Sequence, residues 1–191
     1  SLTKTDGNNV FTSISDKYYE YPSLIKKKYH SLVDKLKDLE DLNKFKADID
    51  NLERLLTIFN LEIIQDIKKN CEVSIDLIGY HGQTIYHNPK KGISRQLGNG
   101  NLLSKLLKIK IVYNFRQNDI LNGGQGAPLT PIFHVMLSKK LKLNSTVILN
   151  IGGILNATTI FEDGNFLATD IGPGMCLVDK WIRLNSILLK K

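Results

Sequence analysis

Two apolar runs joined by a double glycine constrain this chain more than any other feature. Residues 147–149 are apolar and lead into Asn150-Ile-Gly-Gly-Ile-Leu-Asn156, and a second apolar run follows over 157–161. This pattern predicts a β-hairpin that turns at Gly152 and Gly153. Because glycine has no Cβ, the N–H groups of such a turn can approach a phosphate closely.

A carboxylate ends the next predicted strand. Residues 165–170 are predicted to form a strand that ends at Asp170, and Gly172-Pro173-Gly174 is predicted to begin a helix, because proline suits the first helical turn. An acid at a strand end, beside the positive end of a helix, is well placed for proton transfer or for positioning a metal. The alternative is a tight hairpin followed by a helix cap, without any ligand.

Length and composition are those of an ordinary globular protein, with 191 residues, 42% hydrophobic and 24% charged. That length suffices for one sizeable core or a little more than one domain. The net charge is +7, and the 26 basic residues comprise 22 Lys and only 4 Arg. Because arginine is the residue expected for phosphate and base recognition, this bias argues against nucleic acid as a partner and favours a solvated surface.

The cysteines and the hydropathy pattern place the chain in a reducing compartment. Cys71 and Cys176 have neither the spacing of a zinc site nor that of a disulfide framework. We find no apolar run long enough to span a membrane and no signal-peptide pattern, so we expect no membrane partner and a cytoplasmic location.

Glycine is unevenly distributed, since Gly7 is the only one of the 14 glycines before Gly79. The first third is therefore expected to be scaffold, and the tight turns lie in the later part. Apolar spacing predicts one long strand or two short ones over 10–21, strands over 74–79, 109–113 and 165–170, and the hairpin over 147–161. It predicts helices over 23–39, 47–68, 102–107, 131–141 and 175–188. Strands that alternate with helices indicate an α/β fold with a partly parallel sheet, whose sites collect at strand ends.

Polar and glycine-rich loops follow these strands. Residues 80–84 are predicted to be an exit loop in which His81, Gln83 and Thr84 could bind a polar ligand. Arg116 follows the strand at 109–113, where its planar fork suits an anionic or polar ligand, and the alternative is a salt bridge with Asp119. The glycine-rich segment over 122–129 is by itself a weak phosphate signal.

The order of these motifs resembles one family. The set comprises His81-Gly-Gln-Thr84, Gln96-Leu-Gly98, Phe115-Arg116, Gly123-Gly-Gln-Gly-Ala-Pro-Leu129, Asn150-Ile-Gly-Gly-Ile and Asp170-x-Gly-Pro-Gly174. It is similar to that of the anhydro-N-acetylmuramic acid kinases, which belong to the actin, hexokinase and heat-shock chaperone superfamily of ATPases. The resemblance runs from about Ser23 to Ile182. It implies an α/β, ribonuclease H-like and actin-like ATPase domain with a mixed sheet flanked by helices.

The resemblance also implies an activity and its residues. The family cleaves the 1,6-anhydro ring of a recycled peptidoglycan sugar and phosphorylates O6, using ATP with a divalent metal such as Mg. Its partners would be the amino sugar and ATP, and a homodimer is a further alternative. Asp170 takes the place of the catalytic base, and we assign no protein ligand to the metal. The expected sugar-side residues are His81, Gln83, Gln96, Arg116 and Gln125, and the expected nucleotide-side residues are Asn150, Gly152, Gly153, Gly172 and Gly174.

The chain departs from the family pattern at several places. Ile171 stands for a threonine and Met175 for an asparagine of the catalytic motif, and Asn114 stands for an aspartate before Phe115. By resemblance, residues 1–191 are expected to be the N-terminal ribonuclease H-like domain of a two-domain kinase, without the first phosphate-binding hairpin and the C-terminal domain. The alternatives are an inactive truncated remnant or a non-catalytic sugar-binding domain.

Overall fold

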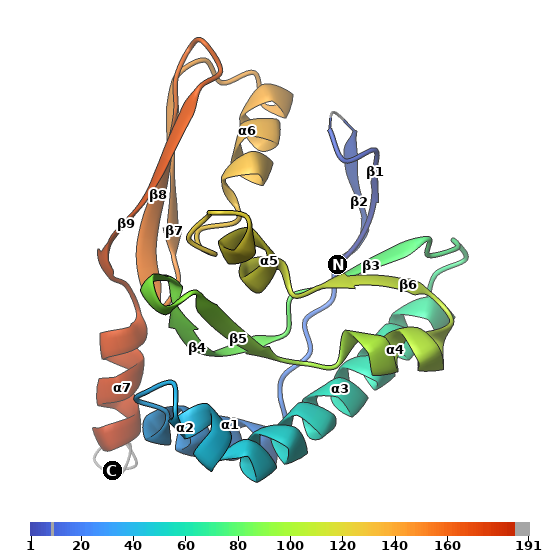
Figure 1. Ribbon diagram of the computed structural model, residues 1–191. Coiled ribbons are helices and arrows are strands. Elements are labelled where there is room, and N and C mark those ends of the chain that lie inside the picture. Colours follow the sequence, from blue (N-terminus) through green and yellow to red (C-terminus); the bar gives the residue numbers. More distant parts are fainter. Residues whose placement is uncertain (9, 186–191) are drawn as a thin grey trace. The chain divides into compact units, whose positions relative to one another are not determined.

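The computed structural model describes residues 1–8 and 10–185 (Figure 1). The chain divides into two compact units, unit 1 with residues 1–3 and 13–126, and unit 2 with residues 4–12 and 127–191. The elements before residue 100 are β1 (Leu2–Thr5), β2 (Phe11–Ser15), α1 (Ser23–Lys35), α2 (Asp41–Lys44), α3 (Lys46–Lys69), β3 (Leu77–Tyr80), β4 (Gln83–Asn88), the 3-10 helix η1 (Pro89–Lys91) and β5 (Ile93–Leu97). They continue with α4 (Gly100–Leu107), β6 (Lys110–Tyr113), α5 (Phe115–Leu121), α6 (Pro131–Lys140), β7 (Thr146–Ile151), β8 (Ile154–Ile160), β9 (Phe166–Pro173) and α7 (Cys176–Asn185).

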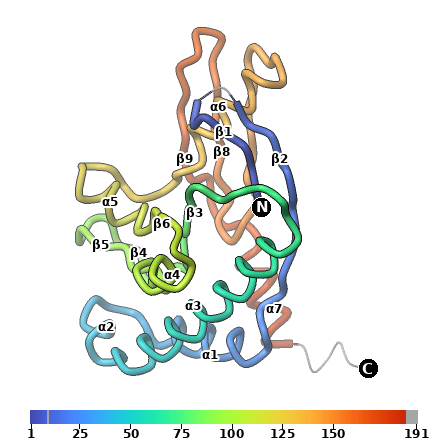
Figure 2. Tube along the Cα trace, turned by 90° about the vertical axis from the view of Figure 1, so that its right-hand side faces the viewer, coloured from blue at the N-terminus to red at the C-terminus, as the bar shows by residue number. Residues whose placement is uncertain are grey.

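The main core of unit 1 lies between α1, α3 and the β4–β5 hairpin. Helices α1 and α3 run side by side in both views (Figures 1 and 2). Their apolar stripes meet the inner face of the hairpin in one buried cluster of Ile25, Leu32, Leu36, Ile49, Leu52, Leu56, Ile85 and Leu97. The helices of the first third therefore form a packed core, as expected for a scaffold.

Several predicted helix and strand limits in unit 1 were wrong, including those of the strand over 74–79, which occupies Leu77–Tyr80. Helix α1 ends at Lys35 because Leu36 adopts an extended conformation, and Leu39 therefore lies outside it. The Asp41 carboxylate instead accepts the N–H groups of Lys37 and Asp38 in the turn that follows. Of residues 10–21, only 11–15 form a strand.

The described strands form four small sheets rather than one continuous sheet. Strands β3 and β6 pair in parallel, as expected for an α/β chain, with Leu77 opposite Lys110 and Tyr80 opposite Tyr113. Strands β4 and β5 pair antiparallel, with Gln83 opposite Leu97. The prediction of a loop over 80–84 was therefore wrong at Tyr80, which ends β3, and at Gln83 and Thr84, which begin β4. Strands β6 and β5 provide the pairing partners, which the local sequence does not reveal.

Unit 2 contains an antiparallel sheet in the order β7-β8-β9 with α6 packed against one face. The predicted hairpin is confirmed, since β7 and β8 flank Gly152 and Gly153. The prediction that Pro173 begins a helix was wrong. Strand β9 continues through Asp170 to Pro173, because it pairs with β8 as far as Ile154, and α7 begins at Cys176. Residues 186–188 of the last predicted helix lie outside the described residues.

Helix α6 covers the face of this sheet that carries Thr158. The Nδ1 atom of His134 lies 2.8 Å from Thr158 Oγ1, and both side chains are buried. The opposite face carries Val147, Leu149 and Leu167, which are exposed. In the part of the chain that the structure describes, no helix is long and apolar enough to cross a membrane.

Candidate functional site

Five of the predicted residues lie in unit 1, and two of them, His81 and Arg116, are hydrogen-bonded to each other. The Nε–H of Arg116 donates to His81 Nε2 over 2.8 Å, and its Nη1 donates to the carbonyl oxygen of Gly126 over 2.8 Å. His81 is exposed, whereas Arg116 is half-buried on the first turn of α5. The structure therefore brings the His81 loop, α5 and the glycine-rich loop together around one guanidinium group.

Asp119 holds the glycine-rich loop against α5. Its Oδ2 accepts the N–H of Gly126 over 2.7 Å, and the backbone N–H of Gly124 donates to its carbonyl over 2.9 Å. A Cβ on Gly124 would lie 2.1 Å from Asp119 Oδ2, so only glycine fits there. Gln125 lies exposed between these two anchored glycines. The sequence offered Asp119 as a salt-bridge partner of Arg116, but it did not predict this contact with the loop.

The amide of Gln83 is hydrogen-bonded to α1, and that of Gln96 is hydrogen-bonded within the β4–β5 hairpin. Gln83 Nε2 donates to the hydroxyl of Tyr29 over 3.3 Å. Gln96 is buried, and its Nε2 donates to Ser94 Oγ over 2.8 Å and to Thr84 Oγ1 over 3.3 Å. Its Oε1 atom is buried without a hydrogen-bond partner among the described residues. A donor such as a ligand hydroxyl would satisfy that oxygen.

Unit 2 carries the predicted nucleotide-side residues at one end of its sheet. Gly152 and Gly153 form the turn between β7 and β8. Their carbonyl oxygens accept hydrogen bonds from backbone N–H groups of the segment just before α7 and of its first residue. Met175 donates to Gly152 over 2.8 Å, and Gly174 donates to Gly153 over 2.9 Å. A Cβ on Gly174 would lie 2.3 Å from Gly152 O, so the segment before α7 packs directly on the turn.

The N–H groups of the same turn are left for a ligand. Within residues 1–8 and 10–185, those of Gly152 and Gly153 donate to no other group. Gly172 lies next to the turn, opposite Leu155 on β8, and a Cβ there would meet nothing within 4 Å. Adjacent unpaired N–H groups in a glycine turn are a known form of anion site, so the turn fits a phosphate group.

Asp170 belongs to a row of polar residues across the three strands. Asn150 is opposite Asn156, and Asn156 is opposite Asp170. Directly opposed residues of antiparallel strands point to the same face, so these three share one face of the sheet. Thr158 follows Asn156 by two residues on that face, so α6 covers the face just beyond the row. Asp170 itself is exposed.

Asn156 is the site residue that the sequence analysis missed. A turn centred between Gly152 and Gly153 would have paired Asn150 with Leu155, but the observed register is centred on Gly153 and places Asn156 opposite Asn150. The row offers two amide oxygens and a carboxylate oxygen, which are donors that Mg²⁺ accepts, usually together with phosphate oxygens. Among the described residues, no three His, Cys, Asp or Glu side chains cluster into a metal site.

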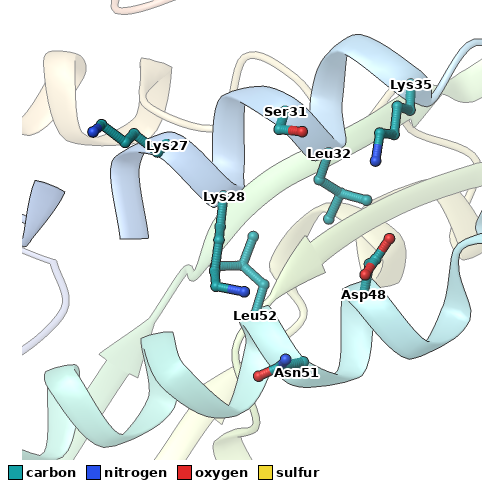
Figure 3. Close-up of a pocket in the computed structure, with 8 residues that line it drawn as sticks. All are labelled: Lys27, Lys28, Ser31, Leu32, Lys35, Asp48, Asn51 and Leu52. Atoms are coloured by element: carbon teal, nitrogen blue, oxygen red, sulfur yellow. The ribbon is translucent and has the colours of Figure 1, made fainter. Parts of the chain in front are cut away.

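A groove between α1 and α3, of about 320 Å³, contains none of these residues (Figure 3). Its lining includes Lys27, Lys28 and Lys35 from α1, and Asp48 from α3. All three lysines are exposed. This groove is a solvated basic surface.

Comparisons with known proteins identify the family of the chain. A family model described as anhydro-N-acetylmuramic acid kinase matches residues 1–187. Proteins of that name are 47% identical over 189 residues in Pelagibacter ubique and 34% identical over 192 residues in Agrobacterium fabrum, each alignment covering 97% of this chain. A third, from Methylobacterium nodulans, is 51% identical over 109 residues, which is 56% of this chain and 29% of that protein.

These relatives are longer than the chain. The alignments cover 50% of the Pelagibacter protein and 52% of the Agrobacterium protein, so the chain spans about half the length of the curated relatives it matches. Since the family model matches nearly the whole chain, the chain belongs to the anhydro-N-acetylmuramic acid kinase family of sugar kinases.

Proposed function

We propose that this chain provides the sugar-side loops and the phosphate turn of an ATP-dependent anhydro-N-acetylmuramic acid kinase that acts in peptidoglycan recycling in the cytoplasm. The reaction would give N-acetylmuramic acid 6-phosphate. The chain would correspond to the N-terminal part of such a kinase, with a ribonuclease H-like and actin-like core.

The observation that carries the proposal is the Asn150–Asn156–Asp170 row beside the glycine turn. It places one carboxylate on the sheet face at the end where Gly152 and Gly153 present unpaired N–H groups. Phosphoryl transfer depends mainly on positioning and on stabilising charge around the phosphates. A turn that binds phosphate and a base on the same sheet supports that chemistry.

Asp170 would act as the general base. It would take a proton from a water molecule whose oxygen bonds to the anomeric carbon, while the bond between that carbon and O6 breaks. O6 would then form a bond to the γ-phosphorus, and ADP would leave. General-base catalysis of this kind contributes about 10²- to 10⁴-fold to a rate.

The remaining residues would bind and orient. The N–H groups of Gly152 and Gly153 would hold phosphate oxygens, and Gly172 would leave room for them. The amide oxygens of Asn150 and Asn156 suit a divalent cation, which when bound neutralises phosphate charge. Arg116, Gln83, Gln96 and Gln125 would contact the sugar in unit 1.

A labelled-water experiment tests the proposal. The whole protein that contains this chain is incubated with 1,6-anhydro-N-acetylmuramic acid, ATP and Mg²⁺ in water enriched in oxygen-18, and the product is examined by mass spectrometry. We expect a sugar 6-phosphate with one heavy oxygen at the anomeric carbon and none in the phosphate. Labelled inorganic phosphate without any sugar 6-phosphate would indicate ATP hydrolysis instead and would overturn the proposed reaction.

The second candidate is a sugar-binding domain without catalysis. The buried, unpartnered Oε1 of Gln96 favours it, because this oxygen belongs to the sugar side alone. In that case the 191-residue chain would bind the anhydro sugar in calorimetry, and the whole protein would form no phosphorylated product.

A further inference from the structure

We propose that His81 is a positioning residue, which orients the guanidinium group of Arg116 and does so only as the neutral tautomer protonated at Nδ1. The sequence analysis gave His81 a direct contact with the sugar. The hydrogen bonds around its ring give it a different task. The consequence for the sugar rests on the proposed function, whereas the tautomer itself does not.

The two hydrogen bonds of the ring require one tautomer. Arginine has no acceptor and stays protonated, so the Nε–H of Arg116 can only donate to His81 Nε2, over 2.8 Å. That nitrogen must therefore carry no proton. Nδ1 lies 2.7 Å from the carbonyl oxygen of Gly82, which can only accept, so Nδ1 carries the proton. Both contacts agree on the same ring state.

The Gly82 carbonyl is held in place by the β4–β5 hairpin. Gly82 has φ of +69°, and a Cβ there would lie 2.2 Å from Leu97 O and 3.6 Å from Gln96 Cβ. Its backbone therefore packs directly on the end of β5, where no side chain fits. The acceptor that selects the tautomer is thus part of the hairpin and not of a freely placed loop.

Arg116 is fixed at a second atom by a separate element. Its Nη1 donates to Gly126 O over 2.8 Å, and the Gly126 N–H donates to Asp119 Oδ2 over 2.7 Å. A guanidinium group is planar and rigid. Holding Nε and Nη1 at once therefore sets the plane and direction of the whole fork. His81 accepts one of these two hydrogen bonds. The tautomer of its ring therefore helps to set the orientation in which Arg116 contacts a ligand.

The tautomer can be measured directly in the 191-residue chain. Nitrogen-15 NMR of the histidine rings at about pH 8 distinguishes the two neutral forms, and the His81→Gln variant identifies the His81 signals by their loss. We expect the Nδ1-protonated form in the parent chain, and a mixture of forms in Arg116→Leu, which removes the donor to Nε2. An Nε2-protonated ring in the parent chain would overturn the inference.

Sugar binding tests the positioning role. By calorimetry with the anhydro sugar we expect His81→Leu to weaken binding about tenfold to a hundredfold, the scale of a lost charge-assisted hydrogen bond. His81→Gln keeps an acceptor and should weaken it less. The double variant His81→Leu/Arg116→Leu should bind the sugar no more weakly than Arg116→Leu, because His81 acts on the sugar only through Arg116. Lys27→Leu, at an exposed position on α1, is the control.

The outcomes separate the two proposals. Parent chain that binds the sugar, with His81→Leu binding equally well, would overturn the positioning role and leave the proposed function intact. Parent chain and whole protein that both fail to bind the sugar would overturn the proposed function, and the NMR result would still decide the inference about His81. Circular dichroism of each variant distinguishes lost folding from lost positioning.

Discussion

The Arg116 cluster of unit 1 and the glycine turn of unit 2 differ in how much of their hydrogen bonding the chain itself satisfies. In the cluster, His81, Gly126 and Asp119 bond to one another or to Arg116. In the turn, carbonyl oxygens are bonded to the segment before α7, but the N–H groups of Gly152 and Gly153 have no acceptor among the described residues.

This difference matches what each region would bind. A sugar is recognised by the direction of a few hydrogen bonds, so its contacts gain from a framework that is set in advance. A phosphate group brings several acceptor oxygens and its own charge, and it is held by N–H groups that nothing else occupies. Under the proposed function, the chain would fix the donors of the sugar side in advance and keep those of the phosphate side unpaired.

The largest expected effect tests whether the turn side carries the chemistry. Asp170→Asn should reduce turnover of the whole protein by on the order of a hundredfold or more, because a neutral amide cannot take the proton. Phosphorylated sugar is measured with ATP in excess. Glu162→Gln, an exposed acid on the turn between β8 and β9, should keep normal turnover. Near-normal activity of Asp170→Asn would remove Asp170 from the chemistry.

The next prediction sharpens the claim that the sugar side is set in advance. Gly82 and Gly92 have φ of +69° and +70°, but only at Gly82 would a Cβ meet backbone, 2.2 Å from Leu97 O. Either substitution by alanine should cost about 1–2 kcal/mol for the left-handed conformation. Gly82→Ala should cost about 1–3 kcal/mol more because the hairpin must move.

Urea unfolding followed by far-UV circular dichroism compares the two variants. The tautomer of His81 should also change in Gly82→Ala and not in Gly92→Ala, since only the first moves the carbonyl that accepts from Nδ1. Equal stabilities would mean that the Gly82 backbone shifts without cost, and that the His81 acceptor is not held by the hairpin.

A matched pair of glycines tests the turn in the same way. A Cβ at Gly174 would lie 2.3 Å from Gly152 O, whereas a Cβ at Gly172 would meet nothing within 4 Å. We expect Gly174→Ala to destabilise unit 2 by about 1–3 kcal/mol through overpacking, and Gly172→Ala to stay within about 0.5 kcal/mol of the parent chain. Trp181, the single tryptophan, lies on α7 and reports unfolding by its fluorescence.

Local patterns predicted the elements that carry their own signal. Helix α3 was predicted over 47–68 and occupies Lys46–Lys69, and α6 was predicted over 131–141 and occupies Pro131–Lys140. Helix α3 has a long apolar repeat, and α6 begins with a proline. The β7–β8 hairpin was predictable because the turn and both strands lie within one short segment.

Contacts between distant segments were beyond such patterns. Strand β4 depends on β5, and the end of β9 depends on β8, so the limits at Gln83 and Pro173 were set by partners and not by local propensity. The contact of Asp119 with Gly124 depends on how α5 meets the loop. The predicted roles of the site residues stay predictions until the experiments above are made.

The smallest expected effect concerns the helix that covers the sheet beside the Asn150–Asn156–Asp170 row. Burial lowers the pKa of His134, so the folded unit favours the neutral ring that contacts Thr158 Oγ1 at 2.8 Å. In the unfolded chain a histidine binds its proton at a higher pH, with a pKa of about 6.5. Between the two pKa values the unfolded state therefore holds more protons, and stability rises with pH.

His134 thus contributes stability that is fully present above about pH 6.5 and is lost as the pH falls through its folded pKa. The urea midpoint followed by Trp181 fluorescence should fall between about pH 7.5 and pH 5.5, a range centred on an ordinary histidine pKa. His134→Gln should flatten that dependence because glutamine has no charge to gain. If His134→Gln keeps the full pH dependence, the loss of stability at acid pH comes from other titrating groups of unit 2. Helix α6 would then tolerate a protonated His134 ring against the sheet.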